Sequence, residues 1–128
     1  MVCLDFTAFF ALASVLSVAV ALPVPNGRRA VTHTGRGTWY DAGLGACGFT
    51  DSNSDPVIAL SVGDYGSGEN CNRWITVTNV ATGAQATGQV RDKCSGCPGD
   101  SIDMSPALFS QLGSLAQGVL QVSWVFDD

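Results

Sequence analysis

The stretch Gln89–Ser105, Q-V-R-D-K-C-S-G-C-P-G-D-S-I-D-M-S, decides how the rest of this 128-residue chain is interpreted. It places a C-x-x-C and a Pro-Gly turn between two short segments, and each segment carries one carboxylate, Asp92 or Asp103. Val90 leads into Asp92, and Asp103 lies between two apolar residues, so both acids sit in stretches with the alternation of β-strands. Two acids at strand ends, joined by a cysteine-pinned loop, can converge on one groove.

Two interpretations of this acid pair stay open when only the spacing is considered. In the first, the pair handles a sugar chain, because a carboxyl group beside a glycosidic oxygen must be held firmly and partly desolvated to stay protonated near neutral pH. In the second, both are ordinary turn acids, since Asp is common in loops. Spacing alone favours the second.

The N-terminal fifth of the chain differs in composition from the rest. Residues 6–21 are almost wholly apolar and end in Ala19-Val20-Ala21, the small-x-small pattern of a signal-peptidase site. We therefore expect residues 1–21 to be a signal peptide and the mature protein to be secreted, although residues 1–5 lack the usual basic residue. The apolar run is shorter than the roughly twenty residues that cross a bilayer, so we expect no membrane association after cleavage.

Residues 22–34 contain two prolines and the dibasic pair Arg28-Arg29, and we expect a flexible arm or short propeptide there. Residues 35–128 are then expected to form one domain, small enough to benefit from disulfides. Removal of residues 1–21 leaves six basic and ten acidic residues, a formal net charge near −4. Such a domain has no basic footprint for nucleic acid or anionic lipid, whereas a neutral polymer is a reasonable partner.

Cysteine usage fits an extracellular domain. Cys3 lies in the predicted signal peptide, and the cysteines of the mature chain are Cys47, Cys71, Cys94 and Cys97. An even number in a small secreted domain predicts two disulfides, with three possible connectivities. We expect no metal site and no cofactor, because only one C-x-x-C is present and the sole histidine, His33, falls in the arm. A single histidine also disfavours a Ser/His or Cys/His catalytic triad.

Hydrophobic patterning predicts a β-rich fold with one helix. Alternating or short apolar runs indicate strands at 35–41, 57–61, 73–80, 85–92 and 119–126, together with the segment around Asp103. A short helix is expected at 106–112, because Ser105 can act as N-cap and Pro106 fits the first helical position. About six strands and one short helix in roughly a hundred residues predict a small all-β barrel.

Aromatic residues outside the core pattern are few. In the loop 63–72, Tyr65 is either a platform on which a sugar stacks or a plug that fills the loop, and the plug is the favoured interpretation. On the first strand, Thr38 and Tyr40 share one face, while Trp39 and Asp41 take the other.

Five motifs in order carry a resemblance to a known family. They are G-T-W-Y followed by G-A-C-G-F (37–49), C-N-R-W-I-T-V-T-N (71–79), V-R-D-K-C-S-G-C (90–97), S-I-D-M-S-P-A-L-F (101–109) and a final V-x-W strand. Together they resemble the expansin-like, or rare-lipoprotein-A-like, double-psi β-barrels, and most of all the single-domain fungal loosenins. Residues 77–85, running on to R-D-K-C, also resemble barwin, a plant defence member of the same superfamily.

The resemblance implies a six-stranded double-psi β-barrel with an open groove that binds a β-linked cell-wall polysaccharide, such as cellulose, chitin or a related β-glycan. The groove residues of loosening members map onto Thr38, Tyr40, Asp92 and Asp103. Asp103 matches the acid with which related family 45 endoglucanases protonate the leaving oxygen. The resemblance also implies the disulfide Cys47–Cys71, which leaves Cys94 to pair with Cys97.

The chain departs from the hydrolases at the second carboxylate. Those enzymes carry their base two residues beyond the matched tyrosine, and this chain has Ala42 there, while strand alternation turns Asp41 to the opposite face. We therefore expect a secreted, monomeric protein that binds polysaccharide and loosens its packing without hydrolysis. Two alternatives remain: a defence or effector module, such as a cysteine-protease inhibitor or chitin binder, and a weak glycan-cleaving enzyme in which Asp92 substitutes for the missing base.

Overall fold

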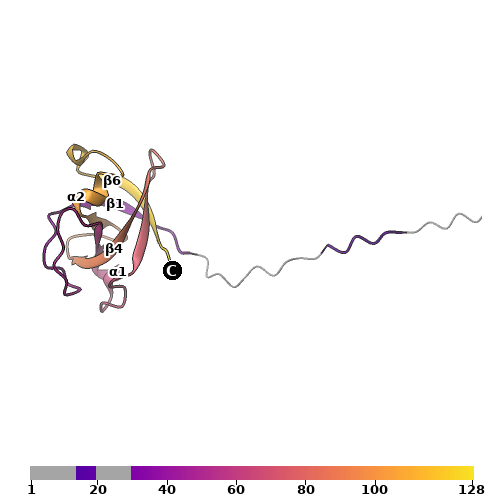
Figure 1. The fold of residues 1–128 in the computed structure, drawn as a ribbon, viewed down its shortest axis with the longest axis horizontal. Helices are drawn as coiled ribbons and strands as arrows, with labels where there is room; N and C mark the ends of the chain where they lie inside the picture. The colour runs from indigo at the N-terminus through magenta and orange to yellow at the C-terminus, as the bar shows by residue number, and fades with distance from the viewer. Residues whose placement is uncertain (1–13, 20–29) are drawn as a thin grey trace, which may run out of the picture.

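Within the residues that the computed structural model describes, 14–19 and 30–128, six strands close into a barrel (Figure 1). The strands are β1 (His33–Trp39), β2 (Val57–Ser61), β3 (Trp74–Asn79), β4 (Gln85–Cys94), β5 (Ile102–Met104) and β6 (Leu120–Phe126). Their order around the barrel is β1-β5-β2-β4-β3-β6. β1 pairs with β5, and β2 with β4, in parallel, and the other neighbours are antiparallel. The predicted six-stranded barrel is confirmed.

The strand bounds agree with the predicted ranges to within two residues at each end. The difference that matters most is at β1, which begins at His33 and not at Gly35, so the histidine assigned to the arm belongs to the barrel.

The predicted signal-peptidase site and the dibasic pair Arg28-Arg29 lie outside the described residues, and residues 14–19 are exposed without helix or strand. In the described part of the chain, no helix has the length and apolar character to cross a membrane.

The helices of the described residues are short. α2 (Pro106–Phe109) begins as predicted, with the Ser105 hydroxyl accepting a hydrogen bond from the Leu108 amide, but it ends three residues earlier than expected. α1 (Val62–Tyr65) and the 3₁₀ turn η1 (Leu115–Gln117) were not predicted, because elements of three or four residues are too short to produce a helical period. The expectation of one helix is therefore corrected to two.

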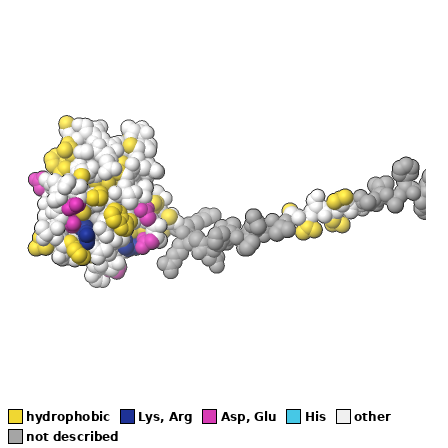
Figure 2. Space-filling model, viewed as in Figure 1, with side chains coloured by type: hydrophobic (Ala, Val, Ile, Leu, Met, Phe, Trp, Pro, Cys, Tyr) yellow, Lys and Arg dark blue, Asp and Glu magenta, His cyan; other side chains and the backbone are white. Residues whose placement is uncertain are grey.

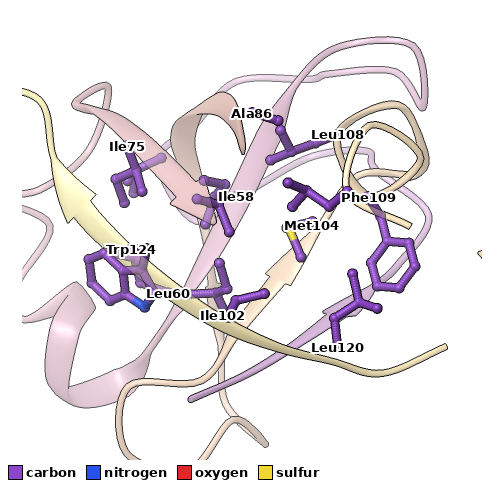
Figure 3. Packing of buried hydrophobic residues seen from close by; sticks show 14 of the residues in the cluster. Ile58, Leu60, Ile75, Ala86, Ile102, Met104, Leu108, Phe109, Leu120 and Trp124 are labelled. Atoms are coloured by element: carbon purple, nitrogen blue, oxygen red, sulfur yellow. The ribbon is translucent and has the colours of Figure 1, made fainter. Parts of the chain in front are cut away.

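Apolar side chains from five strands and α2 fill the barrel (Figure 3). The fully buried members include Ile58, Leu60, Ile75, Val77, Val90, Ile102, Met104, Leu108, Phe109 and Trp124. β1 contributes no large side chain to this interior. Its Gly37 lies against the core: an added Cβ would lie 2.7 Å from Met104 Cε and 3.0 Å from Val122 Cγ1, so these side chains would have to shift to admit one.

Both predicted disulfides, Cys47–Cys71 and Cys94–Cys97, are confirmed. The first ties the loop after β1 to the segment before β3, and the second closes the tight loop after β4. Tyr65 packs with the core cluster, its hydroxyl 3.7 Å from Cys71 Sγ. The interpretation of Tyr65 as a plug is thus confirmed, and the stacking platform is not.

Candidate functional site

Four residues on four neighbouring strands form a row across the barrel wall. Thr38 of β1 is paired with Asp103 of β5. Ala59 of β2 is paired with Asp103 on one side and with Asp92 of β4 on the other. Directly paired residues point to the same face of a sheet, and the two neighbours of Asp103 in β5 are fully buried, so the row faces outward. We call these four residues the acidic row.

The acidic row is joined by hydrogen bonds and extended by Tyr40. Thr38 Oγ1 donates to Asp103 Oδ1 at 3.1 Å. Tyr40 follows directly after β1, and its backbone N–H donates to the Met104 carbonyl at 2.9 Å, which continues the pairing with β5. Burial, and then the carboxylates of Asp92 and Asp103, raise the pKa of the Tyr40 hydroxyl well above its usual value. The structure thus brings the four predicted site residues together, and Tyr40 stays a neutral donor.

The carboxyl group of Asp103 has a raised pKa. Partial burial raises the pKa of its carboxyl, and the nearby charge of Asp92 adds a smaller effect in the same direction. The hydrogen bond from Thr38 acts the other way, because it favours the ionised form. Burial is the larger effect, so Asp103 keeps its proton to a higher pH than an exposed aspartate does.

Asp92 reaches the acidic row through a β-bulge. In β4, Val90 is paired with Ile58, but the next residue of β2, Ala59, is paired with Asp92, so Arg91 is the extra residue. Without the bulge, alternation would place Asp92 on the same inward face as the buried Val90. Bulges re-aim side chains in this way beside functional sites. The sequence pattern gave no sign of this one, because strict alternation treats Val90 and Asp92 as facing the same side.

The loop 42–51 lies directly on the bulge. The amide of Ala46 donates to Asp92 Oδ1 at 2.8 Å, and the amide of Cys47 donates to the Arg91 carbonyl at 3.2 Å. Gly45 approaches so closely that an added Cβ would lie 2.2 Å from the Arg91 oxygen. The disulfide between Cys47 and Cys71 holds this loop in place, so it also helps to fix the orientation of Asp92.

A third carboxylate, Asp51, lies beside the site and was not among the predicted site residues. Its Oδ2 lies 3.6 Å from Arg91 Nε, and both atoms are buried without a hydrogen-bond partner among the described residues. The Arg91 guanidinium also covers the Phe49 ring at 4.1 Å. Asp51 contributes to the raised pKa of Tyr40. Nothing in the local pattern of the sequence distinguishes it from a turn residue.

The position of the missing base carries no carboxylate. Ala42 donates its backbone N–H to Asn53 Oδ1, and the neighbouring Asp41 accepts a hydrogen bond from Asn53 Nδ2 at 3.0 Å. Asp41 is therefore engaged with an exposed loop. The acid–base pair that inverting hydrolysis requires is incomplete at this position.

Comparison with known proteins identifies relatives of this barrel. The chain is 33% identical over 110 residues to the papain inhibitor of Streptomyces mobaraensis, and the match covers 80% of this chain and 75% of the relative. The chain belongs to the barwin-like double-psi β-barrel family. A solved Streptomyces papain inhibitor matches this barwin-like barrel with a TM-score of 0.68 and 30% identity, over 75% of this chain and 94% of the other. No family model matches the chain.

Other relatives of the barwin-like barrel are longer proteins. The chain is 42% identical over 84 residues to an Asp f 7 allergen homologue of Arthroderma benhamiae, and this match covers 62% of the chain. An expansin of Clavibacter michiganensis, solved as a point mutant in complex with cellohexaose, matches with a TM-score of 0.69 and 27% identity over 77% of this chain. The chain spans 28% of the allergen homologue and 51% of the expansin.

Proposed function

We propose that this barwin-like protein is secreted, binds a β-linked cell-wall polysaccharide along the acidic row, and loosens the packing of its chains without cleaving them. The observation that carries the proposal is the alignment of Thr38, Asp103, Ala59 and Asp92 across four neighbouring strands. Strand spacing makes this row about 14 Å long, enough to contact more than one sugar ring. The expansin that was solved with cellohexaose supports a β-glycan as the ligand class.

Loosening would follow from competition between hydrogen bonds. Each net hydrogen bond contributes only about 1 kcal/mol, so several must act together to replace the bonds between neighbouring glycan chains. The row offers carboxylate acceptors at Asp92 and Asp103, and Tyr40 beside it offers a neutral hydroxyl donor. A sugar hydroxyl both donates and accepts, so this mixture suits it.

Cleavage is not proposed, because this chain has Ala42 at the position that carries the base in the related hydrolases. Asp103 has the raised pKa of a proton donor. Asp92 Oδ1, by contrast, accepts hydrogen bonds from the amides of Ala46 and Lys93, both at 2.8 Å. Hydrolysis would require its other oxygen, Oδ2, to act in place of the base that Ala42 does not supply. Incubation with amorphous cellulose is therefore expected to release no reducing sugar, and release that depends on Asp103 would establish hydrolysis instead.

The binding proposal is tested with insoluble cellulose, chitin and peptidoglycan in pull-down assays, and with cellohexaose by calorimetry. Asp103→Asn is expected to weaken retention on at least one polymer, because Asn accepts fewer hydrogen bonds than a carboxylate. Asp127→Asn removes an equal charge from an exposed residue outside the row and serves as the control. Equal binding and equal loosening by wild type and Asp103→Asn would refute the proposed function.

Inhibition of a cysteine protease is the second candidate, supported by the papain inhibitor that shares most of its length with this chain. The loop 42–51 has features that suit insertion into a protease cleft: it is held by a disulfide, and it exposes 76% of Leu44 and 43% of Phe49. Such inhibition would be seen as a loss of papain activity that Leu44→Asp relieves and Asp103→Asn does not. Papain activity that stays unchanged at high protein concentration would remove this candidate.

A further inference from the structure

Three potential metal ligands that are far apart in the sequence meet outside the acidic row. They are His33 at the start of β1, Asp64 in α1 and Asp100 in the loop before β5. His33 Nδ1 lies 3.4 Å from Asp100 Oδ1 and 4.0 Å from Asp64 Oδ1, and all three ligand atoms lie within 4.8 Å of one another. The side chains are 18%, 17% and 42% exposed in that order, so water can still reach the cluster.

Each ligand is held in place by a neighbour. The His33 ring stacks on Trp124 with ring centroids 3.9 Å apart and an angle of 9° between the planes. The Asp64 carboxylate accepts a hydrogen bond from the Ser61 hydroxyl through Oδ2, which leaves Oδ1 facing the histidine. Trp124 Nε1 donates to the backbone carbonyl of Asp100 at 2.8 Å. Outer contacts of this kind orient metal ligands, and here they are in place without an ion.

The two carboxylates of this cluster, Asp64 and Asp100, also bring negative charges close together. Two carboxylate oxygens this close repel each other unless a cation or a proton lies between them. A single imidazole beside the pair offers a nitrogen ligand in addition to the two oxygens. This mixed set suits a borderline ion such as Zn²⁺, whereas Ca²⁺ takes six or more oxygen ligands.

We propose that His33, Asp64 and Asp100 bind a divalent first-row ion, with Zn²⁺ as the best match and water completing the coordination. Bonds of 2.0–2.1 Å in tetrahedral geometry put ligand atoms about 3.3 Å apart. The His33–Asp100 distance of 3.4 Å is already close to this value, and the His33–Asp64 distance of 4.0 Å must shorten by about 0.7 Å. The ion would link the first residue of β1 to the loop that connects β4 and β5.

The test is a calorimetric titration of the full chain with Zn²⁺, together with thermal unfolding at increasing Zn²⁺ concentration and its reversal by EDTA. Cys3 is replaced by Ser in every sample, because a free thiol binds zinc itself. Saturable binding of one ion and a Tm that rises with Zn²⁺ are expected for the wild-type site. His33→Gln and Asp100→Asn are each expected to weaken the affinity by roughly tenfold or more.

Asp127→Asn is the matched control, since it removes the same charge from an exposed residue outside the cluster. It is expected to leave the affinity for Zn²⁺ unchanged. Absence of saturable binding to the wild type would overturn the proposal and leave the cluster as an ion pair. Equal affinity for Zn²⁺ in all variants would also overturn the proposal, because the ion would then bind elsewhere. An equal loss of affinity in Asp127→Asn would overturn it too, because the binding would then be nonspecific. Asp100→Asn alone decides the outcome if His33→Gln does not fold, because Asp100 is the most exposed of the three.

Discussion

At the scale of single residues, Asp103 combines opposing influences on one carboxyl group. Burial raises its pKa, and the Thr38 hydroxyl lowers it by a smaller amount. Since the folded-state pKa exceeds the unfolded value, the folded protein binds protons more strongly between the two values. The stability linked to this proton is present in full at acid pH and is lost as the pH rises through the folded-state pKa.

Replacement of Asp103 by Asn should therefore stabilise the barrel in a pH-dependent manner. Asn resembles the protonated carboxyl group and carries no charge to desolvate. We expect Asp103→Asn to raise the Tm at pH 7 by roughly 1–3 °C and to change it much less at pH 3, where the wild-type acid is protonated in both states. Thermal unfolding at the two pH values measures the difference. A gain of equal size at both would show that the charge is not its cause.

Some residues of the site could be predicted from the sequence, and others could not. The proximity of Thr38, Tyr40, Asp92 and Asp103 could be predicted, because they lie in recognisable family motifs on predicted strands. Asp51 was missed, because a buried ion pair with Arg91 depends on a contact between a turn and a strand far along the chain. The separate cluster around His33 was missed for a different reason: the strand of His33 begins two residues before the predicted one, and its partners come from α1 and from the loop before β5.

At the scale of elements, β4 and the loop 42–51 determine the direction of Asp92. The alternation rule located the strand and the core but gives the wrong face for Asp92, because the bulge at Arg91 shifts the pattern by one residue. No residue type in V-R-D specifies a bulge. What specifies it in the structure is the loop that packs on it, through amide donors to Asp92 and to the Arg91 carbonyl.

Gly45→Ala tests how strongly that loop and the bulge depend on each other. The new methyl group would lie 2.2 Å from the Arg91 oxygen, so backbone on one side must move. We expect a loss of roughly 1–3 kcal/mol in the free energy of unfolding and weaker polysaccharide binding, because Asp92 loses its support. Gly43→Ala, in the same loop, meets nothing within 4 Å and should be close to neutral. Denaturant unfolding compares the two, and similar values for both would refute the coupling.

At the scale of the whole molecule, two disulfides close loops of very different length. Cys47 and Cys71 are 24 residues apart, whereas Cys94 and Cys97 are separated by 3. The chain-entropy model assigns about 3.5 kcal/mol to the first bridge and about 2 kcal/mol to the second. The first also holds the loop that supports Asp92, so it links stability to the acidic row.

Removal of the Cys47–Cys71 bridge by double substitution with Ser should therefore have two effects. The free energy of unfolding is expected to fall by about 3.5 kcal/mol, and polysaccharide binding should weaken under conditions in which the barrel remains folded. The Cys94→Ser/Cys97→Ser variant is the control, with a smaller loss of stability. Denaturant melts and pull-downs at low temperature measure both effects. A larger loss from the short bridge would contradict this order.

The surface of the molecule shows why composition could not locate the function. On the face drawn in Figure 2, acidic and basic side chains are few and lie scattered among uncharged ones. Exposed large apolar residues include Trp74 at the start of β3, Val80 just after β3 and Val119 just before β6. Net charge alone therefore identifies no binding face, and the row becomes visible only when the strand register is known.

The glycine interior of β1 has a mechanical consequence. This strand inserts no large side chain into the barrel interior, so it is held by its hydrogen bonds to β5 and β6 and by the stacking of His33 on Trp124, and Thr38 is part of it. If a polysaccharide chain held by Thr38 and Asp103 were pulled, the load would fall on the parallel pairing of β1 with β5, which joins three residue pairs. The strength of that short pairing would then limit the force that the barrel can exert on a polymer.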